Sequence, residues 1–303
     1  MRPMTDRKDR IDSLAATLLV VCCFLWGLNQ VAAKVALPEV PALWQASLRS
    51  LGGAALVWLW AAARRIPLLQ RDRTGLPGLL AGTLFAAEFA CIFIGLQYTT
   101  ASRMVVFLYL SPFVVALGMP FIARSERLSA AQLAGLGVAF VSVGWAFFEG
   151  FTRPAAGPKQ WVGDALAVLA AALWGATTLV IRASPLSSAS PEKTLLYQLV
   201  VTGFGLGAVA LWNGPPLPAS LSGLAWGSLA FQTVAVTFLS FLVWFWLVRH
   251  YPATKLSSFT LLTPVFGLVL GAVLLDEPIT LRLAVALVGV SAGIYWVNRP
   301  ARG

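Results

Sequence analysis

Charged residues are scarce in this chain. Only 11% of its 303 residues are Asp, Glu, Lys or Arg, whereas 58% are hydrophobic. A soluble globular domain carries about 25% charged residues. So little charge cannot cover a surface that faces water, which excludes the soluble classes of protein. Lipid is therefore the expected solvent.

Histidine, cysteine and catalytic motifs are also in short supply. The chain has one histidine, and its three cysteines (Cys22, Cys23 and Cys91) lie inside apolar stretches without metal-ligand spacing, so neither a metal centre nor a disulfide is predicted. No HExxH pattern occurs. An enzyme is not expected, and no cofactor is implied. The net charge of +10 comes from basic residues between apolar stretches, which is typical of membrane-protein loops and does not indicate a nucleic-acid partner.

Ten apolar stretches follow a polar leader, residues 1–12. Each is long enough for a helix to cross a hydrocarbon core of about 30 Å at 1.5 Å per residue. The first stretch is too long for the apolar part of a signal peptide, so we expect it to be a retained helix. The fold class predicted is an all-α polytopic membrane protein with ten transmembrane helices. The predicted spans are 13–36, 42–63, 76–98, 102–123, 129–149, 161–183, 193–212, 223–249, 254–275 and 280–298.

The positions of Lys and Arg predict the orientation of the chain. If the N-terminus is cytoplasmic, sixteen basic residues fall in cytoplasmic segments and five in external ones. Because basic residues favour the cytoplasmic side, we expect both the N- and C-termini to be cytoplasmic.

One segment of the sequence occurs twice. ASRMVVFLYLSP at 101–112 corresponds to ATKLSSFTLLTP at 253–264, and FLWGLNQVAAK at 24–34 corresponds to ALWGATTLVIR at 172–182. Five spans per copy is an odd number, so the second copy has to enter the membrane from the opposite side. Inverted repeats of this kind are a transporter architecture. The predicted domains are a first five-helix repeat at 13–149 and an inverted second repeat at 161–298.

The same residues resemble a known family. FIGLQYTTASRM at 93–104, the helix with Pro112, ERLS at 126–129, WGLNQVAAK at 26–34 and Arg49 are similar to the pattern of the drug/metabolite transporter superfamily, EamA type. The overall pattern is most similar to the YddG-type amino-acid exporters. The resemblance implies ten helices, alternating access, and a central cavity lined by the first, third and fourth spans of each half. The sequence departs from the pattern at Glu88 and at Arg103, where a small residue is usual.

Ionisable residues within spans need a reason, since each costs about 2.5–3.5 kcal/mol at a helix centre. Glu88 could bind a substrate ammonium or carry a proton; the alternative is a structural partner for Arg49. Arg49 is expected to be a structural clamp, with a substrate carboxylate as the alternative. Lys34 and Arg103 lie near span ends, where long side chains can snorkel to the interface, or they could act in an outer vestibule.

Uncharged polar and aromatic residues complete the candidate site. Asn29 follows Trp26-Gly27, and Thr177-Thr178 follow Trp174-Gly175; such groups can bind a ligand or make interhelical hydrogen bonds. Pro112 and Pro264 are expected to bend their helices, as a fixed shape or a hinge. The predicted substrate-binding residues are Trp26, Asn29, Glu88, Tyr98, Tyr109, Trp174, Thr177, Thr178, Gln232 and Ser258.

Other residues favour packing and lipid contact. Trp58 and Trp60 lie near a span end and fit the interfacial aromatic belt. Small-xxx-small glycine pairs predict close helix packing, with a dimer face as the alternative, so a monomer is expected. The pairs are Gly78/Gly82, Gly203/Gly207, Gly223/Gly227, Gly267/Gly271 and Gly289/Gly293.

These observations predict a secondary transporter of the bacterial inner membrane. We expect it to export amino acids, aromatic and other neutral ones among them, or related small metabolites by alternating access. The alternatives are the same fold moving a nucleotide-sugar, a phosphorylated metabolite or a cationic drug, and a passive facilitator. Its expected partners are a small-molecule substrate and the lipid bilayer.

Overall fold

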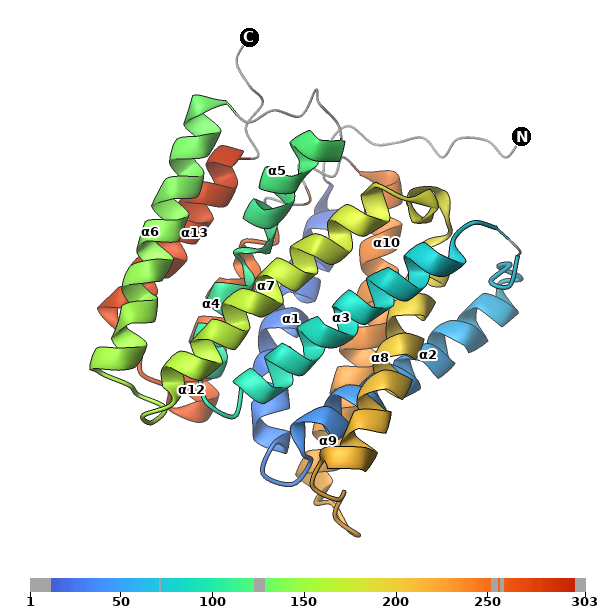
Figure 1. The fold of residues 1–303 in the computed structure, drawn as a ribbon, viewed down its shortest axis with the longest axis horizontal. Coiled ribbons are helices and arrows are strands. Elements are labelled where there is room, and N and C mark those ends of the chain that lie inside the picture. The colour runs from blue at the N-terminus through green and yellow to red at the C-terminus, as the bar shows by residue number, and fades with distance from the viewer. Residues whose placement is uncertain (1–11, 71, 123–128, 252–255, 257–258, 298–303) are drawn as a thin grey trace.

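The structure is a computed structural model that describes residues 12–70, 72–122, 129–251, 256 and 259–297. Every regular element in these residues is helical (Figure 1). The first half of the chain forms α1 (Ser13–Ala36), α2 (Ala42–Ala63), α3 (Gly75–Gly95), α4 (Ala101–Leu108), α5 (Ser111–Ile122) and α6 (Ala130–Thr152).

The second half is also a series of helices. A 3₁₀ turn, η1, follows the first of them, and a π-helix, η2, lies between two α-helices. The elements are α7 (Gln160–Arg182), η1 (Pro185–Ser188), α8 (Pro191–Asn213), α9 (Gly223–Ala230), η2 (Phe231–Ser240), α10 (Phe241–His250), α12 (Leu262–Leu275) and α13 (Leu281–Val297).

Seven helical segments are long and apolar enough to cross a membrane, and α12 and α13 are shorter apolar helices. The helix α2, which carries Gln45 and Arg49, is not among the seven. The chain is therefore a multi-pass membrane protein with a fully helical core in its described part. The seven segments are 13–36, 75–95, 101–122, 130–152, 160–182, 191–213 and 223–244.

Local sequence signals fix where several helices begin. Asp12 caps α1 by accepting a hydrogen bond from the Ala15 amide at 2.9 Å. Ser129 and Gln132 form a capping box at the start of α6, which satisfies two amides that have no partner within the helix. Pro191 occupies the first position of α8, where a missing N–H costs nothing.

The bundle has two ends, which we name from α1. The proximal end is where α1 begins, and the distal end is where α1 finishes. The connections α1–α2, α3–α4, α6–α7, α8–α9 and α12–α13 lie at the distal end, and the connections α2–α3 and α7–α8 lie at the proximal end (Figure 1).

The helix α4 lies at the centre of the bundle. All eight of its residues are buried, and they form the middle of the largest cluster of buried apolar side chains. A buried helix places its polar residues inside the protein as well, which decides the surroundings of Arg103.

The span with Pro112 is broken rather than bent. The helix α4 ends at Leu108, and α5 begins at Ser111, so Pro112 lies in the first turn of α5, where a proline is tolerated. Pro264 likewise lies in the first turn of α12. Pro120 lies inside α5, and the sequence analysis did not single it out.

Two glycines allow close helix contacts that mirror each other. A Cβ at Gly27 of α1 would lie 2.9 Å from Phe266 Cβ and 3.1 Å from the Thr263 carbonyl oxygen of α12. A Cβ at Gly175 of α7 would lie 2.5 Å from Val114 Cβ and 3.2 Å from the Ser111 carbonyl oxygen of α5. Both contacts join one half of the chain to the other.

The predicted glycine pairs also pack closely, with one exception. A Cβ at Gly78 or Gly82 would collide with α8, at Gly203 or Gly207 with α2, and at Gly289 or Gly293 with α6. A Cβ at Gly267 or Gly271 would collide with α4. Gly223 and Gly227 have nothing within 4 Å. Interhelical packing is thus confirmed for four of the five pairs.

Candidate functional site

Three polar side chains are buried at one depth in the bundle. Asn29, Arg49 and Glu88 are 7%, 3% and 4% exposed. Each lies seven residues from the distal end of its helix, in α1, α2 and α3 respectively. At 1.5 Å per residue this is about 10 Å below that end. The three helices therefore place an amide, a cation and a carboxylate in one polar layer.

Arg49 is held by the other half of the chain. Its Nε and Nη2 atoms donate to Thr237 Oγ1 at 3.2 and 2.7 Å, and its guanidinium lies 4.4 Å from the centre of the Phe89 ring. Its Nη1 atom is buried and has no hydrogen-bond partner. The guanidinium is thus positioned on one edge and has one free donor group.

The π-helix η2 sets the position of Thr237. The Thr237 hydroxyl donates to the Gln232 carbonyl oxygen at 2.8 Å, five residues earlier, and it accepts from Arg49. Gln232 Nε2 donates to Gln45 Oε1 at 2.7 Å. Short π-helical segments occur mostly at functional sites. Here the segment links its own backbone to the polar residues of α2.

Glu88 faces Arg49 without an ion pair between them. The two charges interact electrostatically, but the salt bridges of 4.0 Å or less in the described part of the chain do not include this pair. Glu88 Oε2 is buried and has no hydrogen-bond partner. A direct Arg49–Glu88 clamp, one of the expected arrangements, is therefore not what this structure shows.

Other buried polar atoms of the described residues also lack hydrogen-bond partners. An unsatisfied buried polar group costs about 1–3 kcal/mol, and native proteins keep few of them without a reason. Those in the described residues come from both halves of the chain. Besides Arg49 and Glu88 they include Asn29 Oδ1, Gln30 Oε1, Gln45 Nε2, Thr202 Oγ1, Gln232 Oε1 and Thr263 Oγ1.

Aromatic side chains line the break between α4 and α5. Tyr109 is 6% exposed, and its ring meets Trp174 of α7 edge-on, with ring centroids 6.2 Å apart. Trp26 Nε1 donates to Ser240 Oγ at 2.8 Å, and its ring meets Trp244 edge-on at 5.6 Å. Both tyrosine and tryptophan therefore join spans from different halves.

A second polar cluster lies at the distal end. Arg103 is 3% exposed, and its Nη2 and Nη1 atoms lie 2.7 and 3.1 Å from Asp164 Oδ2 and Glu149 Oε2. Thr99 donates to Asp164 at 2.6 Å, and Thr280 donates to Glu149 at 2.7 Å. Arg103 therefore does not snorkel to the interface; it ties α4 to α6 and α7.

Two more charged residues extend this distal cluster. Glu277 accepts hydrogen bonds from the Ala101 and Ser102 amides at 2.7 and 2.9 Å, so a carboxylate caps the first turn of α4 and favours its positive end. Lys34 Nζ donates to the carbonyl oxygens of Leu96, at 3.1 Å, and Thr99. Lys34 thus holds α1 to the α3–α4 connection.

The chain matches a known family twice. A model of the EamA-like transporter family matches residues 13–148 and again residues 161–299. This chain belongs to the EamA-like transporter family. The two matched ranges are separated by the connection between α6 and α7.

The relatives of this EamA-like transporter are distant. It is 28% identical over 296 residues to the uncharacterized transporter YvbV of Bacillus subtilis, covering 95% of this chain and 92% of the relative. It is 26% identical over 295 residues to a probable amino-acid metabolite efflux pump of Salmonella typhimurium, covering 95% and 94%. A solved protein crystal structure matches with a TM-score of 0.65 and 19% identity, over 94% of this chain and 96% of that one. That likeness shows the fold alone.

The structure brings some predicted site residues of the EamA-like transporter together and separates others. Glu88 and Asn29 share the polar layer with Arg49, and Gln232 joins it through Thr237. Thr177 is buried and bonds to the Leu173 carbonyl. Trp174 is 38% exposed, Thr178 is half-buried and bonds to the Trp174 carbonyl, and Tyr98 is half-buried in the α3–α4 connection. Ser258 lies outside the described residues.

Loop contacts hold the helix ends together and lower the pKa of two carboxyl groups. At the proximal end, the Lys193 ammonium bonds to Asp72 at 2.7 Å and, with Thr74, lowers the pKa of that carboxyl to about 2. At the distal end, hydrogen bonds from Ser222 lower the pKa of Glu39. Each contact links a loop of the first half to the start of a helix in the second.

Proposed function

We propose that this EamA-like transporter exports amino acids, aromatic and other neutral ones among them, or related small metabolites across the bacterial inner membrane by alternating access. The observation that carries the proposal is the pair Arg49 and Glu88. A buried cation with a free donor and a buried carboxylate with a free oxygen lie at one depth. An amino acid carries a carboxylate and an ammonium group, so it can bind the guanidinium of Arg49 and the carboxylate of Glu88 at the same time.

The roles of the two residues follow from their chemistry. Arg49 Nη1 binds the substrate carboxylate while Nε and Nη2 keep their structural bonds to Thr237. Glu88 Oε2 binds the substrate ammonium. Tyr109, Trp26 and Asn29 supply aromatic and amide surface for the rest of the substrate.

We also propose ten membrane crossings in two inverted repeats, residues 13–149 and 161–298, with both termini in the cytoplasm. The mirrored glycine contacts support this. Gly27 of the first half packs on the Thr263 carbonyl, and Gly175 of the second packs on the Ser111 carbonyl. These are the positions that the Trp-Gly and Ser/Thr-Pro repeats align.

The test is a competition panel in proteoliposomes that contain the purified protein. The label is a neutral amino acid, and the competitors are the same amino acid, its methyl ester, its decarboxylated amine and its 2-hydroxy acid. The intact amino acid should compete well, and the three analogues, each lacking one charge, should compete at least tenfold less well.

Two variants test the Arg49 anchor. Arg49→Gln should weaken uptake of the amino acid, and Arg49→Lys should restore part of it because the charge remains. Label uptake no faster than in empty liposomes, with phosphorylated metabolites or cationic dyes moving instead, would overturn the proposal.

A further inference from the structure

The chain doubles back on itself directly after α2. The Arg65 amide donates to the Ala62 carbonyl at 3.1 Å, and the Ile66 amide donates to the Ala61 carbonyl at 2.8 Å. Arg65 has a φ of 53°, which is a left-handed conformation. Glycine is favoured at this position of a helix end. Arginine is strained there. Strain of this kind persists where the surrounding structure fixes the backbone, and it clusters at functional sites such as ligand clamps.

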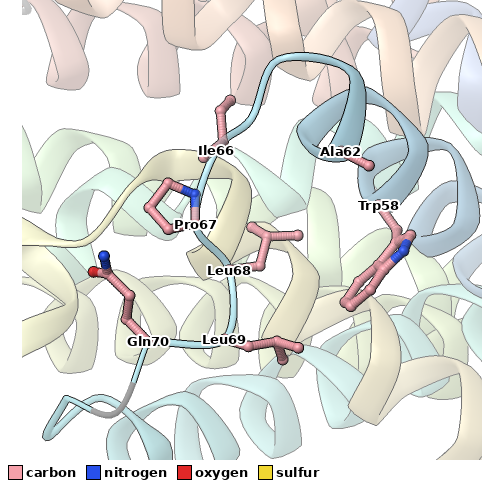
Figure 2. A pocket seen from close by; sticks show the side chains of 7 residues that line it. All are labelled: Trp58, Ala62, Ile66, Pro67, Leu68, Leu69 and Gln70. Atoms are coloured by element: carbon pink, nitrogen blue, oxygen red, sulfur yellow. The ribbon is translucent and has the colours of Figure 1, made fainter.

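The returning segment and the last turns of α2 enclose a pocket of about 390 Å³. Trp58 lies on α2 opposite Leu68 and Leu69 of the returning segment (Figure 2). Leu69 is 80% exposed and Trp58 is 44% exposed. Trp58 is five residues before the end of α2, about 7–8 Å along the helix. The pocket thus extends along the last turns of α2.

Exposed arginines flank the pocket-lining segment in the sequence, with Arg64 and Arg65 before Ile66 and Arg73 after Gln70. Arg64, Arg65 and Arg73 are all exposed, and the Arg64 guanidinium lies 4.7 Å from the centre of the Trp60 ring. The one carboxylate in the same loop, Asp72, is bonded to the Lys193 ammonium. Because Asp72 is engaged by Lys193, the arginine charges are available to a ligand outside the protein.

We propose that this loop binds an anionic phospholipid, with the arginines on its head group and the upper part of an acyl chain in the pocket. Basic pockets beside membrane helices bind anionic head groups, and the apolar lining with exposed leucine and tryptophan fits a hydrocarbon chain rather than a soluble anion. The loop lies at the proximal end, away from the Arg49–Glu88 pair, so the inference does not depend on the proposed cargo.

The test is native mass spectrometry of the purified full chain titrated with three probes. Dioleoyl phosphatidylglycerol and dioleoyl phosphatidylcholine have the same chains and differ in net charge, and glycerol phosphate has an anionic head without chains. Phosphatidylglycerol should bind at least fivefold more tightly than either of the others. Each arginine near an anionic surface contributes about a fivefold gain in binding.

Two double variants locate the site. Arg64→Gln with Arg73→Gln should weaken phosphatidylglycerol binding at least fivefold. Arg153→Gln with Lys159→Gln removes two exposed charges from the distal end and should leave binding unchanged. Unchanged binding in the first pair, equal loss in the second, or equal binding of the three probes would each overturn the inference.

Arg65→Gly separates the ligand role from folding. Glycine relieves the left-handed strain, so thermal stability in detergent should stay equal or rise, while phosphatidylglycerol binding falls. A variant that is more stable and binds phosphatidylglycerol as tightly as the wild type would show that Arg65 has no part in the site.

Discussion

The buried position of Arg103 leads to a prediction about stability. In Arg103→Met, Asp164 keeps only the hydrogen bond from Thr99, and Glu149 keeps only the one from Thr280. Asp164 is fully buried and Glu149 is 6% exposed, so two carboxylates would be left inside the protein without a cation. Breaking a buried pair in this way costs about 3–5 kcal/mol. We expect the free energy of unfolding to fall by about that amount.

The assay is equilibrium unfolding in mixed micelles, followed by tryptophan fluorescence. Arg153→Met, which removes an exposed arginine at the same end of the bundle, is the matched control and should change the free energy by less than about 0.5 kcal/mol. The triple variant Arg103→Met, Glu149→Gln, Asp164→Asn removes the charges together and should recover much of the loss. If Arg103→Met differs from wild type by under about 1 kcal/mol, or if the triple variant is the least stable, the reasoning is wrong.

Three other perturbations test the fold and the site. Glu88→Gln should reduce amino-acid uptake in proteoliposomes at least tenfold at every pH, since the ammonium loses its carboxylate; a profile that only shifts along the pH axis would indicate a proton role instead. Gly27→Ala should lower the free energy of unfolding by about 1–3 kcal/mol through overpacking against α12, and Gly175→Ala should do the same against α5. The control is Gly137→Ala, where an added Cβ has nothing within 4 Å; it should be neutral or slightly stabilising. Asp72→Asn should cost the same stability from pH 5 to pH 8, because the lowered pKa of about 2 keeps the contribution complete above the ordinary carboxyl pKa near 3.8. The contribution is lost progressively as the pH falls from about 3.8 to about 2. A cost that shrinks between pH 8 and pH 5 would contradict this.

The helices could be predicted because local sequence signals mark where they begin and end. The predicted spans 13–36 and 42–63 coincide with α1 and α2, since continuous apolar runs end at proline or charge. The π-helix at 231–240 could not be predicted. It depends on how η2 packs against α1 and α2, and no residue pattern within it marks the change from α-helical hydrogen bonding.

The site was predictable in part, for a similar reason. Glu88 and Arg49 were found because a charge within an apolar span is conspicuous. Asp164 and Glu149 lie near span ends and were not predicted as site residues, since their partner Arg103 is 61 and 46 residues away. Thr177 is buried and Thr178 is only half-buried, but a membrane helix that is apolar all round offers no polar face from which to predict which one points inward.

The pairing of helices across the two halves has a consequence for biosynthesis. The most extensive contacts join α6 to α13, α3 to α7, α2 to α8 and α1 to α12, so most packing partners of the first five spans are made after them. At about 5–20 residues per second, the roughly 150 residues of the second half take roughly 8–30 s to emerge. During that time Arg49 and Arg103 have inserted without Thr237 and Asp164, their contacts from the later half. The ribosome therefore leaves a half-made protein in the bilayer before these contacts between the halves can form, and that interval is when a membrane chaperone or protease would act.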